Sequence, residues 1–328
     1  RLKRVRPSDI RRFFSLAQSA PNVISLGIGE PDFAPPPNVL EAAKQALNEG
    51  KTHYTPSMGI LELREALVKK AKNEYGLSYN PENEVLVTNG GTEAIFLALL
   101  AVINPLNEVL VPNPGFVCYE PDVLMADGIP VSVPLFEKDG FKYNADTVMS
   151  RITKKSRVII VNSPNNPVGH VLSYEEAANI AKIAVERDLI VISDEVYEKI
   201  VYDGVKHYSL ATFPGMKERT VVVNSFSKTY AMTGFRVGYV FGPKEIIAQM
   251  LLALQYTVAC VNGPAQHAAL AALEGPQDSV KNMVQEFDRR RQLIYSGLMG
   301  IKGFRCILPK GAFYIFPNIQ DFGKSSAE

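Results

Sequence analysis

The sequence predicts an α/β protein with two domains. The large domain has a mostly parallel, doubly wound sheet of seven strands, and the smaller domain is α+β. Seven short apolar runs have the composition of buried strands, and helical patterns separate several of them. Such alternation is typical of a parallel sheet covered by helices on both faces. A chain of 328 residues is long enough to bury one large core and a smaller second one.

We expect three segments along the chain. Residues 1–37 form an N-terminal arm and part of the small domain, residues 38–283 form the large domain that binds the ligand, and residues 284–328 complete the small domain. The arm carries one short helical stretch, residues 9–17. The last boundary marks the point where the alternation of strands and helices stops.

Two helices open the large domain. Apolar residues at helical spacing predict a helix from Asn38 to Leu47 and a second helix that begins after Gly59. A polar loop, residues 51–59, joins them. It contains Tyr54, which has no obvious core partner in the sequence.

The first strand, residues 84–88, is followed by Asn89-Gly90-Gly91-Thr92 and an apolar helix at residues 93–103. Two glycines before a helix leave backbone N–H groups pointing one way, with the positive end of the helix dipole behind them. This turn is therefore a candidate anion site. Taken alone, the two glycines fit a tight turn that binds nothing equally well.

The remaining pattern completes the sheet and the small domain. Further strands are predicted at residues 108–111, 130–133, 157–161, 189–193, 220–223 and 237–241. Ser173-Tyr-Glu-Glu176 forms a capping box at the start of a helix that ends at Arg187. Three helices between residues 243 and 298 precede a strand pair, residues 304–308 and 312–316, with a turn at Pro309-Lys-Gly311.

Charge and composition exclude several classes of function. Thirty-five basic and 34 acidic residues give a net charge of +1, so no overall field attracts nucleic acid or an anionic membrane. The longest wholly apolar run, residues 94–103, is too short to span a bilayer. Three widely spaced cysteines predict reduced thiols and a cytoplasmic location. The four histidines lack the spacing of metal ligands, so we expect no metal.

The stretch from Thr220 to Gly238 contains the most informative residue. A strand that is apolar on both faces leads through Asn224-Ser225-Phe226-Ser227 to Lys228. Ligands of open α/β sheets bind at the carboxyl ends of the strands, so Lys228 is a candidate nucleophile. A Ser-x-Ser-Lys motif alone is more often an ordinary surface lysine, and the other strand ends decide between the two interpretations.

Two other predicted strands end in polar residues at the same edge. The strand that ends at Val161 continues into the proline-bounded loop 162–169, which presents Asn166. The strand that ends at Ser193 delivers Asp194, and Tyr197 follows three residues later. These groups match the requirements of pyridoxal 5′-phosphate. The aldehyde of that cofactor takes a lysine, its ring nitrogen takes a carboxylate, and its phosphate takes a helix N-terminus, hydroxyls and an arginine.

Together the motifs resemble those of the class I aminotransferases, fold type I of the pyridoxal-phosphate enzymes, and especially the aspartate and aromatic aminotransferase branch. The resemblance extends from residue 24 to residue 314. Its most specific pieces are Asn-Ser-Pro-Asn-Asn-Pro-x-Gly, Ser-Asp-Glu-Val-Tyr and Ser-Phe-Ser-Lys-x-x-x-Met-x-Gly-x-Arg-x-Gly.

The resemblance implies a role for each matching residue. Lys228 forms the Schiff base, and Asp194 pairs with the pyridinium nitrogen. Tyr197 and Asn166 bond the phenolate oxygen, and Asn166 also reaches the substrate carboxylate. The groups expected to hold the phosphate are Gly91, Thr92, Ser225, Ser227, Arg236 and Tyr54 of the partner subunit, which implies a homodimer. Phe116 stacks on the ring, and the backbone near Gly29 closes over the substrate.

The sequence departs from the family pattern at two places. Val168 stands where the family usually has a threonine, which removes a hydroxyl but no known reacting group. The arginine that binds the substrate α-carboxylate in relatives lies in a C-terminal segment beyond Glu328. We therefore expect several dozen further residues, and the alternative is that the chain as it stands is inactive.

The implied activity is a ping-pong aminotransferase that moves the α-amino group between an L-amino acid and 2-oxoglutarate. Aspartate or an aromatic amino acid is the best candidate donor, and the sequence does not decide between them. A lyase or decarboxylase on the same scaffold is the alternative.

Two other classes fit less well. A serine hydrolase acting through Ser225 and Lys228 requires Ser-Asp-Asn and Lys-Thr-Gly motifs, where this chain has Ser193-Asp-Glu195 and Lys51-Thr-His53. A ligand sensor fused to a DNA-binding module requires a basic recognition helix, which this sequence lacks.

Overall fold

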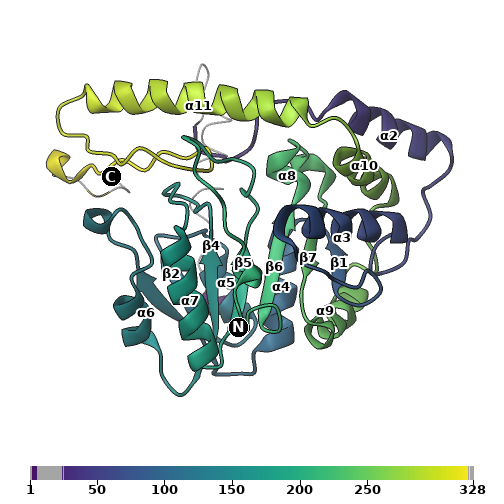
Figure 1. The fold of residues 1–328 in the computed structure, drawn as a ribbon, viewed down its shortest axis with the longest axis horizontal. Helices are drawn as coiled ribbons and strands as arrows, with labels where there is room; N and C mark the ends of the chain where they lie inside the picture. The colour runs from purple at the N-terminus through teal and green to yellow at the C-terminus, as the bar shows by residue number, and fades with distance from the viewer. Residues whose placement is uncertain (1, 6–23, 25, 324, 326–328) are drawn as a thin grey trace.

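The computed structural model describes residues 2–5, 24, 26–323 and 325. Its strands form one sheet (Figure 1). The strands are β1 (Val85–Thr88), β2 (Glu108–Asn113), β3 (Ile129–Pro134), β4 (Ser156–Asn162), β5 (Ile190–Asp194), β6 (Thr220–Ser225) and β7 (Gly238–Phe241). All seven predicted strands are confirmed, each within two residues of its expected ends. The helical stretch predicted at residues 9–17 lies outside the described residues.

The strand order is β1-β7-β6-β5-β4-β2-β3. The pairs β2–β3, β2–β4, β4–β5 and β5–β6 are parallel, and β7 is antiparallel to both of its neighbours. Six strands therefore point the same way, which confirms the mostly parallel sheet. As a result, their carboxyl ends share one edge.

Helices cover both faces of the sheet. One face packs on α4 (Gly91–Val102), α5 (Tyr119–Met125) and α9 (Lys244–Thr257). The other face packs on α2 (Pro37–Asn48), α3 (Leu61–Tyr75) and α10 (Gly263–Glu274) at one end and on α6 (Ala145–Arg151) and α7 (Tyr174–Glu186) at the other. Successive residues of β6 alternate between these two cores, as the pleat of a strand requires.

The predicted capping box is present at the start of α7. Ser173 Oγ accepts from the Glu176 N–H at 3.2 Å, and the Glu176 carboxylate accepts from the Ser173 N–H at 3.0 Å. The three predicted helices near the C-terminus are also confirmed as α9, α10 and α11 (Asp278–Met299). Short 3-10 turns complete the described elements: η1 (Leu2–Arg4), η2 (Glu137–Asp139), η3 (Leu210–Thr212), η4 (Thr233–Phe235) and η5 (Gln320–Phe322).

The predicted strand pair at residues 304–308 and 312–316 is wrong. Neither segment is a strand among the described elements, and the antiparallel bridge of the first segment, Arg305 to Asn318, reaches a residue beyond the second. The backbone near the turn bonds to the loop after β5 instead, because the Ala312 N–H donates to the Ile200 carbonyl at 2.9 Å and Gly311 bridges Val201. Figure 1 shows α11 along one edge of the molecule, with the residues that follow it folded back beneath it.

Within the described part of the chain, no helix is both long and apolar enough to cross a bilayer.

Candidate active site

Polar side chains gather where the parallel strands end. Asn162 is the last residue of β4 and pairs in register with Asp194, the last residue of β5. Asp194 in turn lies beside Val223 of β6, which ends at Ser225. The three strand ends therefore lie side by side, as the sequence predicts. This edge is where open α/β sheets bind their ligands.

Lys228 lies on the one-turn helix α8 (Phe226–Thr229), directly after β6. Its ammonium group donates a 2.5 Å hydrogen bond to the Gly29 carbonyl and lies 6.0 Å from the centre of the Tyr197 ring. Burial lowers the pKa of the Lys228 amine to about 8, although the Glu30 carboxylate acts in the opposite direction. More of this amine is therefore neutral and nucleophilic near neutral pH than in an exposed lysine.

Asp194 is a buried carboxylate with only 3% of its surface exposed. The Tyr119 hydroxyl donates to its Oδ2 at 2.6 Å, and the Val196 N–H donates to its Oδ1 at 3.3 Å. Burial raises the pKa of Asp194 to about 6, and these two hydrogen bonds oppose the rise. A cation against this carboxylate would favour its ionised form, so Asp194 fits a protonated ring nitrogen.

Tyr197 and Asn166 meet at one oxygen atom. The Tyr197 hydroxyl lies 2.5 Å from the Tyr314 hydroxyl, and Asn166 Nδ2 donates to the same Tyr314 oxygen at 3.3 Å. Asn162 fixes this arrangement, because its Oδ1 accepts from the Asn166 N–H at 2.7 Å and its Nδ2 donates to the Asp194 carbonyl at 3.0 Å. The geometry shows that one phenol oxygen can contact both donors at once, as the phenolate oxygen of pyridoxal phosphate requires.

Close backbone packing shapes the turn between β1 and α4. Gly90 has φ of +87°, and a Cβ there would lie 2.5 Å from Arg236 Nη2. A Cβ on Gly238 would lie 2.8 Å from the Gly91 nitrogen. Glycine is therefore required at both positions. Gly91 begins α4, whose first N–H groups have no partner within the helix.

The groups around this turn suit a phosphate. Arg236 donates to two neutral carbonyl oxygens, those of Thr233 at 3.0 Å and Asn89 at 3.3 Å. Ser225 Oγ lies 2.9 Å from Ser227 Oγ, and the Ser227 N–H donates to Ser225 Oγ at 3.1 Å. A guanidinium group, two hydroxyls and a helix N-terminus form a set that binds oxyanions.

The other predicted residues differ in how closely they join this group. Phe116 packs edge-to-face on Tyr119, with ring centres 5.6 Å apart, and so adjoins Asp194. Gly29 contacts Lys228 through its carbonyl. Thr92 is exposed at the start of α4. Tyr54 is 91% exposed, so it does not line the site of its own chain as the structure describes it.

Three residues of the site were not predicted as partners of the catalytic and cofactor-binding residues. Asn162 could have been found, because it is the last residue of the strand that presents Asn166. Tyr119 carried a weaker signal, since it follows Phe116 by three residues in a segment that also starts a helix. Tyr314 lies 117 residues from Tyr197 in the chain, and no local pattern joins them.

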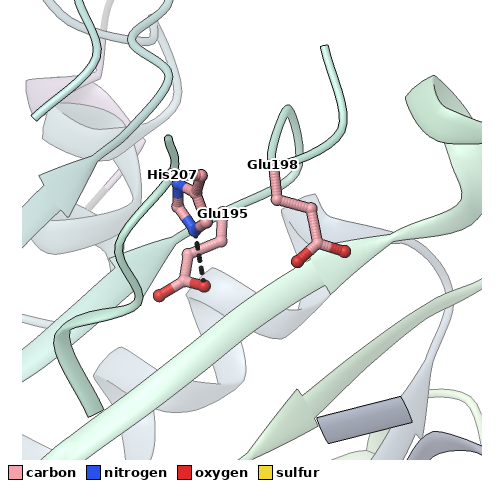
Figure 2. A group of neighbouring side chains, drawn as sticks. All are labelled: Glu195, Glu198 and His207. Carbon is pink, nitrogen blue, oxygen red and sulfur yellow. Dashed lines mark hydrogen bonds and ion pairs between the residues drawn. The ribbon is translucent and has the colours of Figure 1, made fainter. Parts of the chain in front are cut away.

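One cluster of the described residues has the side-chain types of a metal site. Glu195, Glu198 and His207 place their ligand atoms within 4.8 Å of one another (Figure 2). Their carboxylate oxygens already accept hydrogen bonds from Ser193, Ser209, Lys70, Tyr75 and His207. A metal would have to displace these donors, so we assign the cluster to hydrogen bonding.

Comparison with known proteins agrees with this geometry. Residues 21–322 match the family model "Aminotransferase class I and II". The chain is 46% identical to aromatic-amino-acid aminotransferase 2 of Thermococcus litoralis and 47% identical to aspartate aminotransferase of Pyrococcus abyssi. Each alignment covers 100% of this chain and 85% of the relative.

Solved structures are also similar. Aspartate aminotransferase of Thermus thermophilus with maleate superposes with a TM-score of 0.91 at 38% identity, over 96% of this chain and 83% of that one. The chain therefore belongs to the class I and II aminotransferases and is a transaminase that uses pyridoxal 5′-phosphate to act on small amino and oxo acids.

Proposed function

We propose that this enzyme transfers the α-amino group between an L-amino acid and 2-oxoglutarate by a ping-pong mechanism, with the cofactor held as a Schiff base on Lys228. One observation carries the proposal. A partly buried lysine with a pKa of about 8 and a buried carboxylate with a pKa of about 6 share the carboxyl edge of the sheet.

The cofactor would lie between these two groups. Asp194 would pair with its ring nitrogen, Tyr197 and Asn166 would bond its phenolate oxygen, and Phe116 would cover its ring. Its phosphate would lie against the residues that line the turn into α4: Gly91, Thr92, Ser225, Ser227 and Arg236. When bound, pyridoxal phosphate supplies an electron sink that makes the substrate Cα–H acidic.

Lys228 also has the properties of the proton carrier. Once an incoming amino acid displaces it from the aldehyde, its free amine can move a proton between the substrate Cα and the cofactor C4′. A pKa near 8 suits both tasks, because the amine can accept and return a proton near neutral pH. Asn166 and the backbone of Gly29 would orient the substrate.

The pH dependence of cofactor uptake tests the role of Lys228. Only the neutral amine attacks the aldehyde, and it is protonated below its pKa of about 8. The rate of Schiff-base formation should therefore rise with pH up to about 8 and level off above it. Stopped-flow absorbance with added pyridoxal phosphate measures this rate.

Lys228→Ala should abolish the absorbance of the linked cofactor and reduce turnover by at least roughly a thousandfold. Lys182→Ala, on the exposed face of α7, is the matched control and should behave as the parent does. Sustained transamination by Lys228→Ala would refute the assignment.

Replacing Asp194 tests the ring-nitrogen contact. Asp194→Asn keeps the shape and the Tyr119 contact but removes the negative charge. It should bind the cofactor and lose at least roughly a hundredfold in kcat, since the ring is then a weaker electron sink. Asp122→Asn is the control, because Asp122 is a similarly buried carboxylate on α5, only 5% exposed. Equal loss in both variants would show that Asp194 matters for folding alone.

The substrate pair is the next part of the proposal. The two relatives compared above are named for aspartate and for aromatic amino acids, and we propose these as donors with 2-oxoglutarate as acceptor. A lyase or decarboxylase remains the runner-up, because the same scaffold supports several reactions of this cofactor.

Product analysis separates these activities. Incubation with aspartate or phenylalanine and 2-oxoglutarate should yield glutamate in equal amount to the oxo acid formed from the donor. Release of ammonia or carbon dioxide without glutamate would favour the runner-up. A panel of donors, followed by the half-reaction spectrum of the cofactor, would then rank aspartate against aromatic side chains.

The proposal includes a homodimer in which Tyr54 of the partner subunit completes the phosphate site. Tyr54 is 91% exposed in the single chain, which leaves its hydroxyl accessible to a partner subunit. Sedimentation at working concentration should give a dimer. Tyr54→Phe should weaken cofactor retention, and the variant should remain a dimer. A fully active monomer would remove Tyr54 from the site.

A further inference from the structure

The segment at the end of β5, residues 194–198, directs its side chains to two sides. Asp194 and Tyr197 contact Tyr119 and Tyr314 in the candidate active site. Glu195 and Glu198 instead contact residues that come from the opposite side. Figure 2 shows both carboxylates on the same side of this segment, close to His207.

Glu195 is fixed through all of its polar atoms. Its Oε1 accepts from Ser193 Oγ and Ser209 Oγ, both at 2.8 Å, and its Oε2 lies 3.1 Å from His207 Nε2. Its backbone N–H donates to the Val223 carbonyl at 2.9 Å. With 1% of its surface exposed, Glu195 ties the start of the segment to β5, β6 and the loop before η3.

Glu198 ties the end of the segment to α3. Its Oε1 accepts from Lys70 Nζ at 2.6 Å, and its Oε2 accepts from the Tyr75 hydroxyl. Burial opposes ionisation, but the Lys70 and Lys199 ammonium groups prevail and lower the pKa of Glu198 to about 2. Glu198 is therefore an ionised carboxylate inside the protein, only 5% exposed.

Burying Glu195 and Glu198 beside Asp194, three carboxylates in one five-residue segment, is a costly way to stabilise a fold. Well-packed apolar side chains of similar volume often give equal or greater stability than a buried ion pair. What the carboxylates add is direction, since Glu195 bonds to β5 and to the loop before η3, whereas both oxygens of Glu198 bond to α3. A segment held this way has little freedom to rotate.

We propose that Glu195 and Glu198 are positioning residues, which hold residues 194–198 from behind so that Asp194 and Tyr197 point at the cofactor. This inference rests on the proposed function, because that proposal assigns Asp194 to the ring nitrogen and Tyr197 to the phenolate oxygen. Neither glutamate touches the reacting atoms. Their effect is transmitted through the backbone between them.

The test compares Glu195→Gln and Glu198→Gln with the parent enzyme loaded with pyridoxal phosphate. Each variant should load cofactor yet lose roughly 10- to 100-fold in kcat, the loss expected when a reacting group is displaced by about 1 Å. In Glu198→Gln the pH midpoint of the absorbance of the bound cofactor should rise by about one unit, because the Tyr197 hydrogen bond to the phenolate oxygen weakens.

Glu74→Gln is the matched control. Glu74 bonds the same Lys70 ammonium at 2.7 Å but lies on α3, outside residues 194–198. Its kcat and spectral midpoint should stay within about twofold and about 0.2 units of the parent, since a partly exposed ion pair contributes little. Variants of Glu195 and Glu198 that also keep both values, while only their Tm falls, would overturn the positioning role.

A second variant tests the same proposal if Glu198→Gln folds poorly. Glu198→Leu combined with Lys70→Met removes both charges and keeps the volume, so it should recover thermal stability. The proposal predicts that its kcat and spectral midpoint stay shifted, and full recovery of both would overturn it. A parent protein that takes up no pyridoxal phosphate would overturn the proposed function itself, whereas a working parent with unchanged variants overturns the positioning role alone.

Discussion

The site depends on the common direction of the strands. Because β4, β5 and β6 are parallel neighbours, Asn162, Asp194 and Ser225 must end at one edge, whatever the loops between them do. The chain then needs only short extensions to add chemistry. One turn of helix after β6 delivers Lys228, and a three-residue step after β5 delivers Tyr197. A pleated, parallel sheet thus converts distant stretches of sequence into one cluster of functional groups.

Burial at this edge sets the acid-base properties of the cluster. Removal from water disfavours charge, so the pKa of Lys228 falls to about 8 and that of Asp194 rises to about 6. The pKa values of the two groups therefore lie on either side of neutral pH, and each is closer to neutral pH than in an exposed side chain. A cofactor with an anionic phosphate and a cationic ring nitrogen would supply an anion for the site beside Arg236 and a cation for Asp194. Glu198, the buried carboxylate behind the segment, differs because the Lys70 and Lys199 ammonium groups outweigh burial and lower its pKa to about 2.

Local patterns were enough to predict the sheet, its strands and the capping box of α7, because each is determined by neighbours in sequence. The motifs near Lys228 and Asp194 were equally local. The final strand pair was wrong because the segment around Gly311 bonds to the loops after β4 and β5, a preference that only tertiary contact reveals. Tyr314 and Lys70 were not predicted for the same reason, since their partners, Tyr197 and Glu198, lie 117 and 128 residues away in the chain. The division at residues 37 and 283 stays a prediction.

The central claim is that Lys228 carries the cofactor. Borohydride reduction of the protein with pyridoxal phosphate, followed by peptide mass mapping, tests it directly. The account predicts one pyridoxyl group per chain, attached at Lys228. A label on another lysine, or no label after reduction, would contradict it.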